Sequence, residues 1–216
     1  MWHDELVTYE LRRATGSDTA ALYQICLRTA ADGADASSQY ADPDLLGHFY
    51  VGPYVELEPE LAFVVADEAQ VVGYVIGAAD TRQFAAACEQ RWFPRLRRHY
   101  PRPAADDTSA DAQVVRLLYR GIDISSATPA HPAHLHIDLE PAGQGQGWGR
   151  RLIERFEDEL RERGVPGLHL TVSATNSAAI AFYERLDLER QQCTADSVVY
   201  TRSLLEGRSE RRAANM

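Results

Sequence analysis

Residues 134–140 read His-Leu-His-Ile-Asp-Leu-Glu and alternate polar with apolar side chains. Successive side chains of a strand point to opposite faces, so His134, His136 and Asp138 share one face and Glu140 continues it. Imidazoles and carboxylates can move protons near neutral pH, and they are costly to cover with an apolar helix. We therefore expect this face to line a cleft. An edge strand with one wet face is the alternative.

A glycine-rich turn follows directly, with Gly145, Gly147 and Gly149 at a spacing of two. Glycine removes side chains from the turn and lets backbone N–H groups approach a ligand closely. The helical pattern that follows places these donors at a helix N-terminus, which favours phosphate by about 0.3 to 1 kcal/mol per charge interaction. The turn is neither a dinucleotide fingerprint, which would need glycine at Arg150, nor a P-loop with its Lys-Ser/Thr pair.

Hydrophobic periodicity predicts the elements that position this turn. A moderately alternating strand spans 6–13, a helix follows a cap at Ser17 or Asp18, and a second helix starts at the N-cap Asp42 with Pro43 in its first position. The remaining expected elements are a buried hairpin of strands (61–66 and 71–78), helical segments (81–100 and 112–119), a helix carrying Leu152 and Phe156, a strand (168–173), a helix opened by Asn176, and one or two strands within 192–204.

The 216 residues are 45% hydrophobic and show no linker-like composition break, which predicts one domain over 1–205, with an insertion at 81–131 and a flexible tail at 206–216. A net charge of −10 argues against broad nucleic-acid binding. Apolar runs are too short to cross a bilayer, and no signal peptide is evident. Three widely spaced cysteines suggest neither disulfides nor a zinc site, so we expect a reducing, cytoplasmic location.

Two motifs together resemble one family. The order Leu139-x-Pro141-x-x-Gln144-Gly-x-Gly-x-Gly149 is similar to the acyl-CoA pyrophosphate loop of the GNAT N-acetyltransferases, and residues 176–186, Asn-Ser-Ala-Ala-Ile-Ala-Phe-Tyr-Glu-Arg-Leu, are similar to that family's second landmark. The order of expected elements also agrees with the family. Residues 32–37, 42–47 and 50–54 more narrowly resemble bacterial relatives of the acetyltransferase-like C-terminal domain of eukaryotic O-GlcNAc hydrolases.

The resemblance implies an α/β fold of the α+β type, the acyl-CoA N-acyltransferase fold, in which a mixed central sheet is flanked by helices and a two-helix insertion precedes the motif strand. It implies that acetyl-CoA binds with its pyrophosphate on the turn and its pantetheine arm between two strands that splay apart. The implied cofactor-binding residues are Leu139, Gln144, Gly145, Gln146, Gly147, Trp148, Gly149, Arg150, Asn176, Ala179 and Tyr183.

For catalysis, the resemblance implies a backbone N–H near Leu139 at the thioester carbonyl and Tyr183 as the acid for the departing thiolate. The glutamate that often serves as general base in lysine acetyltransferases is missing here. His134 or His136 could take the proton, and Asp138 could orient the imidazole or act instead. Each of the three is equally well explained as a hydrogen-bonded cleft residue.

Three functions follow as alternatives. The first is an enzyme that transfers an acetyl group directly from acetyl-CoA to an amine of a small molecule, sugar or peptide; the second is a non-catalytic acetyl-CoA-binding module. The third is a metal-dependent hydrolase, since His134-x-His136-x-Asp138 opens such a motif, but the motif is not completed and no metal ligand is assigned. A homodimer is left open.

Two further features bear on the acceptor. Arginines gather in the insertion and predict either a solvated helix face or a site for an anionic acceptor or the CoA 3′-phosphate. Tyr50 and Tyr54 are interpreted as aromatic core, with the lining of the cleft as the alternative.

Overall fold

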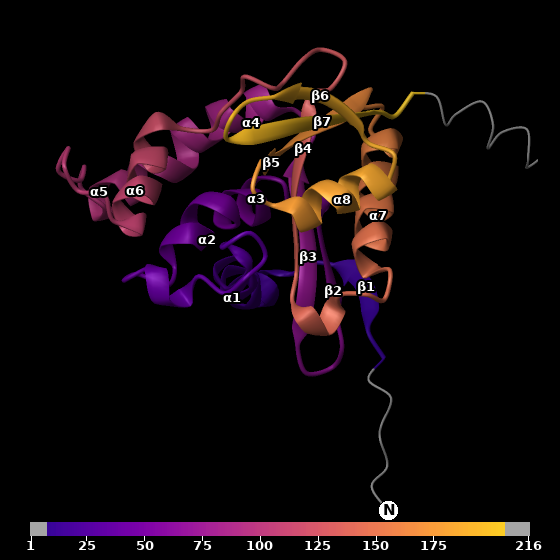
Figure 1. Ribbon diagram of the computed structural model, residues 1–216, viewed down its shortest axis with the longest axis horizontal. Coiled ribbons are helices and arrows are strands. Elements are labelled where there is room, and N and C mark those ends of the chain that lie inside the picture. The colour runs from indigo at the N-terminus through magenta and orange to yellow at the C-terminus, as the bar shows by residue number, and fades with distance from the viewer. Residues whose placement is uncertain (1–7, 206–216) are drawn as a thin grey trace, which may run out of the picture.

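A seven-stranded mixed sheet forms the centre of the computed structural model, which describes residues 8–205 (Figure 1). The strands lie in the order β1-β2-β3-β4-β5-β7-β6, and all neighbours are antiparallel except β4 and β5. Their bounds are β1 (Glu10–Arg13), β2 (Ala62–Ala66), β3 (Val71–Ala78), β4 (Ala133–Leu139), β5 (Gly167–Ser173), β6 (Glu189–Cys193) and β7 (Ser197–Ser203).

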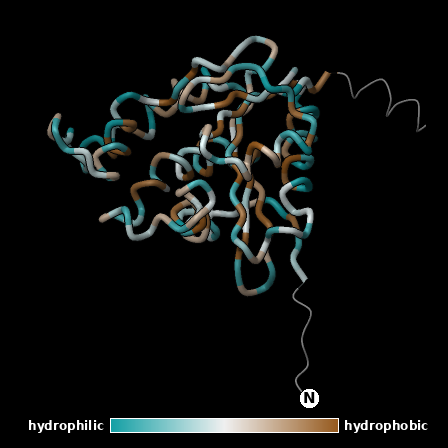
Figure 2. Tube along the Cα trace, viewed as in Figure 1, coloured by the Kyte–Doolittle hydropathy of each residue, from teal (hydrophilic) through white to brown (hydrophobic). Residues whose placement is uncertain are grey.

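Helices cover both faces of this sheet (Figure 1). One face carries α1 (Thr19–Thr29), α2 (Leu45–Tyr50), α3 (Gly52–Leu57), α4 (Thr81–Ala87), α5 (Phe93–His99) and α6 (Ala110–Arg120), and the other carries α7 (Trp148–Glu162) and α8 (Ser177–Arg185). Each side has its own buried apolar cluster, one running through Ile76 and the other through Val75. Alternate side chains of β3 therefore pack into the two clusters, as expected for a central strand. The buried strands and helices are coloured as hydrophobic along much of the trace (Figure 2).

The sheet opens between β4 and β5. Their parallel pairing is limited to two positions, Ala133 with Leu168 and His134 with His169, although each strand has seven residues. Beyond His134 the two strands separate, which confirms the expected splay. The gap lies at the carboxyl ends of two parallel strands, where open α/β sheets bind ligands.

Most expected elements are confirmed, with two local corrections. Strands 61–66 and 71–78 are β2 and β3, and the insertion contributes α4, α5 and α6. The second helix begins at Leu45 rather than at Pro43, because the side chain of Asp42 accepts the Asp44 N–H and forms a turn first. The helical segment 81–100 is broken by a π-helical turn, Cys88–Trp92, which separates α4 from α5.

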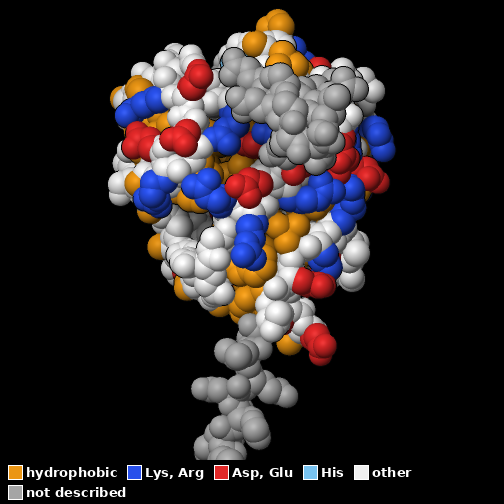
Figure 3. Space-filling model, turned by 90° about the vertical axis from the view of Figure 1, so that its right-hand side faces the viewer, with side chains coloured by type: hydrophobic (Ala, Val, Ile, Leu, Met, Phe, Trp, Pro, Cys, Tyr) orange, Lys and Arg blue, Asp and Glu red, His pale blue; other side chains and the backbone are white. Residues whose placement is uncertain are grey.

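The outer face of α7 carries acidic and basic side chains that form ion pairs along the helix. Acidic and basic side chains are interspersed over this side of the molecule (Figure 3). Arg155 and Arg163 both pair with Glu159, at 3.0 and 3.1 Å, and Arg161 pairs with Glu157 at 2.7 Å, all at the helical spacing of four. Such pairs support the helix that follows the glycine turn.

None of the helices within residues 8–205 has the length and apolar character needed to span a bilayer. The expected tail 206–216 and the first part of the expected strand 6–13 lie outside the described residues. The single-domain assignment over 1–205 stays a prediction.

Candidate functional site

The polar face of β4 is turned toward α1, α2 and α3. His134, His136 and Asp138 lie opposite Ala78, Ile76 and Tyr74 of β3, in that order. Because β4 is the fourth of seven strands, the edge-strand alternative is wrong. His134 is buried, and His136 and Asp138 are half-buried.

Glu140, which was expected to continue this face, lies just after the strand. Its carboxylate pairs with Arg28 of α1 at 2.5 Å. The acidic side chain therefore ties α1 to the end of β4, beside the glycine turn.

Hydrogen bonds fix the protons on the two histidines. The hydroxyl of Thr81 donates to the carbonyl of Pro132 at 2.7 Å, so it must accept the bond from Nδ1 of His134 at 2.8 Å. Neutral His134 then carries its proton on Nδ1, and its Nε2 accepts from the Tyr54 hydroxyl at 2.8 Å. The Tyr54 oxygen in turn accepts from Nε2 of His136 at 3.1 Å. Among the described residues, Nδ1 of His136 is left as an acceptor without a hydrogen-bond partner.

Burial keeps both imidazoles neutral. Desolvation lowers the pKa of His136 to about 4, and desolvation followed by the neighbouring His136 and His169 lowers the pKa of His134 well below its usual value. Both ring nitrogens of His134 are already bonded within the network. The structure thus favours His136 over His134 as the side chain with a lone pair available to a ligand.

Asp138 is held from the other direction. The Tyr74 hydroxyl donates to its Oδ2 at 2.5 Å, and burial is the largest influence, raising the pKa of the carboxyl above its usual value. Cys26 of α1 contributes to the same environment, where burial raises its thiol pKa to about 12. Asp138 is therefore fixed two residues from His136 on the same strand face.

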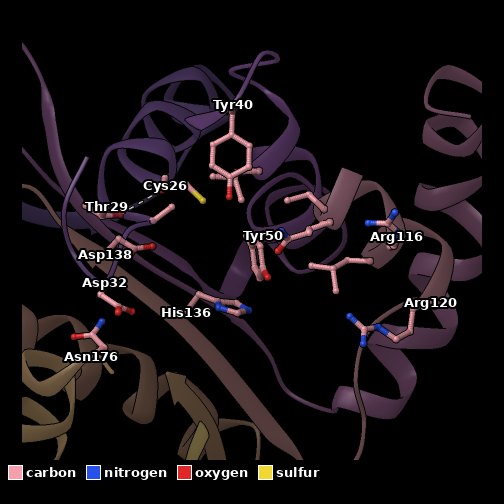
Figure 4. Close-up of a pocket in the computed structure, with 15 residues that line it drawn as sticks. Cys26, Thr29, Asp32, Tyr40, Tyr50, Arg116, Arg120, His136, Asp138 and Asn176 are labelled. Atoms are coloured by element: carbon pink, nitrogen blue, oxygen red, sulfur yellow. Dashed lines mark hydrogen bonds between the residues drawn. The ribbon is translucent and has the colours of Figure 1, made fainter. Parts of the chain in front are cut away.

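Two adjoining pockets open on this face. The central pocket has a volume of about 760 Å³ and is lined by Cys26, Thr29, Ala30, Asp32, Tyr40, Leu46, Tyr50, Gln113, Val114, Arg116, Leu117, Arg120, His136, Asp138 and Asn176 (Figure 4). A neighbouring pocket of about 590 Å³ extends toward His169 and Thr171. Both are lined by Tyr50, Leu117, Arg120 and His136, so His136 lies where they meet.

The glycine turn leaves a row of backbone donors exposed. Gly145 and Gly147 have left-handed φ angles of 73° and 81°, and a side chain at either would meet open space. Helix α7 begins after the N-cap Gly147, and its first recorded backbone bond comes from the N–H of Arg151. Among the described residues, no backbone acceptor is recorded for the N–H groups of residues 145–150. This is a ready anion cradle.

The glutamines of the turn stabilise its shape. The Gln144 side chain donates to the carbonyl of Leu139 at 2.8 Å, and the Gln146 side chain donates to the carbonyl of Ala142 at 2.8 Å. Gly149 is needed for packing, since a Cβ there would lie 3.0 Å from the ring of Phe182 on α8.

The other predicted binding residues flank the turn and α8. Arg150 donates to the carbonyl of Arg185, the last residue of α8, at 3.1 Å. Asn176 caps α8 by accepting the Ala179 N–H at 3.0 Å, which leaves its amide NH₂ as a donor in the central pocket. The indole nitrogen of Trp148 is enclosed without a hydrogen-bond partner in the part of the chain that is described.

Backbone groups also point into the gap between β4 and β5. The N–H of Glu140 donates to the carbonyl of Val72, next to the first residue of β3. Backbone groups of alternate residues point to the same neighbouring strand, so the N–H and C=O groups of His136 and Asp138 also point toward β3. The backbone N–H and C=O groups of Ile137 and Leu139 must then point into the gap. The Leu139 carbonyl is taken by Gln144, whereas its N–H remains a donor.

Tyr183 lies on the opposite side of the gap, within the α7 and α8 core. Its side chain is buried, and desolvation followed by the charge of Asp138 raises the pKa of its hydroxyl above the usual range. The hydroxyl keeps its proton at neutral pH and has no recorded hydrogen bond within residues 8–205. The predicted residues therefore surround the gap from three sides: the turn, the polar face of β4, and α8.

Sequence reasoning missed two parts of this arrangement. Tyr54 was interpreted as aromatic core; it is indeed buried, but its hydroxyl bridges the two histidines. No sequence pattern marked Thr81, because its role depends on a hydrogen bond to the carbonyl of Pro132, about fifty residues later in the chain. In the region that the structure describes, no group of three or more His, Cys, Asp or Glu side chains is arranged to hold a metal ion.

A model of the acetyltransferase (GNAT) family matches residues 23–188, most of the chain. The chain belongs to this family. A crystal structure of the protein SsHAT is 40% identical in sequence, with a TM-score of 0.83 over 91% of this chain and 98% of that one. The yncA structure from Salmonella typhimurium, a putative acetyltransferase with its cofactor acetyl-CoA, shares the fold at 16% identity and a TM-score of 0.54, over 92% and 95% of the two chains.

Two curated relatives match parts of their own length. Protein O-GlcNAcase of Rattus norvegicus is 24% identical over 82% of this chain, and this chain spans about a fifth (20%) of that protein. The ribosomal protein bS18-alanine N-acetyltransferase of Escherichia coli K12 is 53% identical over 51 residues, 24% of this chain and 34% of that one. The expected family and the link to O-GlcNAcases are thus both confirmed.

The buried imidazoles predict a loss of stability as the pH falls. Unfolded histidine titrates near pH 6.5, whereas folded His136 stays neutral down to about pH 4. Between these values the unfolded state binds more protons, so the stabilisation is complete above pH 6.5, falls progressively as the pH is lowered from there, and is fully lost below about pH 4. Urea denaturation at pH 7 and at pH 5 should show a decrease on the order of 2 kcal/mol from this group.

Two variants test whether His136 causes this decrease in the free energy of unfolding. His136→Asn should reduce the difference between the two pH values, whatever it does to stability at pH 7. His99→Asn changes an exposed histidine on α5 and should leave the difference in place. If His136→Asn kept the full pH dependence, the neutral, buried imidazole would be the wrong description.

Proposed function

We propose that this protein binds acetyl-CoA in the gap between β4 and β5 and transfers the acetyl group to an amine. The observation that carries the proposal is the gap itself. It joins a row of N–H groups at residues 145–150 to a strand edge, and both lack a backbone partner in the part of the chain that is described. A phosphate-bearing ligand with an extended, amide-containing arm fits both parts. The arm can pair with a strand edge as an added strand does.

The binding roles follow from the free donors. The N–H groups around Gly145 and Gly147, together with the start of α7, would hold the pyrophosphate. The open space at both glycines fits this use, since nothing of the protein fills it. The Asn176 amide NH₂ would donate to the arm. Bound acetyl-CoA would supply an acetyl group activated as a thioester.

Three groups would then carry the transfer. Nδ1 of His136 would take the proton of the attacking amine, and the Leu139 N–H would donate to the thioester oxygen as charge develops there. The Tyr183 hydroxyl would give its proton to the departing thiolate sulfur. A carbon–nitrogen bond forms as the carbon–sulfur bond breaks, and solvent returns the one proton and removes the other. His134 and Asp138 would serve as positioning residues.

The relatives support this proposal in a limited way. The Salmonella structure shows the same fold around acetyl-CoA, and the Escherichia coli enzyme is named for acetyl transfer to an alanine amine. No acceptor is carried over from either. The alternative, a binding module without turnover, shares the cofactor site and differs only in the chemical step.

Binding can be tested at the glycine turn with a matched control. Gly147→Leu would fill the space that the proposal gives to the pyrophosphate, and should weaken acetyl-CoA binding by about tenfold or more in isothermal titration calorimetry. Gly164→Leu is the control, because Gly164 has a similar φ of 72°, faces open space and lies just after the other end of α7. Equal affinities for the two variants would place the pyrophosphate elsewhere.

Turnover needs a separate test at His136. His136→Asn should keep acetyl-CoA affinity within about twofold, yet lower amine-dependent release of the CoA thiol by about 100-fold, the usual contribution of a general base. His99→Asn should leave both unchanged. Intact acetyl-CoA binding without thiol release from any of a broad panel of amines would favour the binding module.

A further inference from the structure

Charge is separated along the central pocket. Asp32, Asp138 and Asn176 lie together at one end, and Arg116 and Arg120 at the other, with His136 between them (Figure 4). The acidic groups come from β4 and the loop after α1, whereas both arginines come from α6 in the insertion. One pocket thus offers opposite charges at two ends.

Among the described residues, the acidic end has no basic partner of its own. Asp138 accepts from the Tyr74 hydroxyl, and Asp32 accepts from the Thr175 hydroxyl at 2.6 Å. Both donors are neutral, and no ion pair of either carboxylate is recorded within residues 8–205. Asp138 is half-buried, and a half-buried carboxylate that lacks a cation favours a cationic ligand; Asp32 is exposed and adds negative charge at the rim of the same end.

The basic end has the opposite property. The guanidinium of Arg120 has neither an ion pair nor a hydrogen bond among the described residues, and it lines both pockets. Within residues 8–205, the recorded partners of the Arg116 guanidinium are the carbonyls of Ala104 and Asp107, at 2.8 and 2.6 Å. In contrast, arginines on α7 such as Arg161 have glutamate partners.

Polar groups between the ends are also available. The hydroxyls of Tyr40 and Tyr50 have no recorded hydrogen bond in the described part of the chain, and both residues line the pocket, with Tyr50 beside His136 (Figure 4). A volume of about 760 Å³ falls within the range of small-molecule sites, roughly 300 to 1,000 Å³.

We infer that the acceptor is a small amine that also carries an anionic group, a carboxylate or a phosphate. Its amino group lies at the Asp32 and Asp138 end, within reach of His136, and its anionic group binds Arg120. This inference rests on the proposed acetyl transfer and adds the class of acceptor. Arg120 is assigned as a specificity-determining residue.

Matched amines test the assignment directly. β-Alanine is compared with β-alaninamide, and ethanolamine phosphate with ethanolamine, so that each pair differs in one anionic group and the two pairs separate carboxylate from phosphate. Thiol release from acetyl-CoA is measured for each, as is the melting temperature of the CoA-saturated protein. At least one anionic member should exceed its neutral partner by about tenfold or more in kcat/KM or in affinity.

The variant Arg120→Gln should abolish this preference by weakening only the anionic member. Arg98→Gln removes the same charge from an exposed position on α5, outside both pockets, and should preserve it. The inference is overturned if neither pair is discriminated, if no member binds or reacts, or if the preference survives Arg120→Gln. If any of these results is obtained while the protein still binds acetyl-CoA, only the acceptor class is rejected. If the unmodified protein does not bind acetyl-CoA, the proposed function is rejected.

Discussion

The rest of the structure depends on one interruption of the sheet, where β4 and β5 part after two paired positions. Backbone N–H and C=O groups inside a sheet normally satisfy one another, and leaving them unpaired is costly unless another group binds them. Here the carbonyl of Leu139 accepts a hydrogen bond from the Gln144 side chain, while the N–H of Leu139 is left as a donor in the gap. The glycine turn at the end of β4 adds further free donors. The gap is therefore polar on its edges yet enclosed by two apolar cores.

The polar face of β4 solves a related problem. Three ionisable side chains on a central strand would be expensive to bury as charges, and the structure keeps the two imidazoles neutral instead. Tyr54 and Thr81 satisfy both nitrogens of His134 and orient His136, so that one lone pair remains for a ligand. A network whose members are all bonded is rigid, which is what a positioned proton acceptor requires.

The parts that the sequence could predict are those governed by local rules. Alternation along residues 134–140, the hairpin of β2 and β3, and the glycines before α7 each depend on neighbours within a few positions. The bridge through Tyr54 and the contact of Thr81 with Pro132 join residues about fifty to eighty positions apart, so no periodicity could show them. The later start of α2 is a local competition, won by the side-chain turn of Asp42. The placement of Arg120 opposite Asp138 depends on how the insertion packs, which composition alone leaves open.

The central claim is that one ligand occupies both the turn and the gap. A crystal structure with acetyl-CoA tests it most directly. We expect pyrophosphate oxygens within hydrogen-bond distance of the N–H groups of residues 145–150, the arm between β4 and β5, and the thioester oxygen at the Leu139 N–H with the sulfur near Tyr183. Acetyl-CoA bound with its pyrophosphate away from the turn, or with the gap between the strands closed, would contradict it.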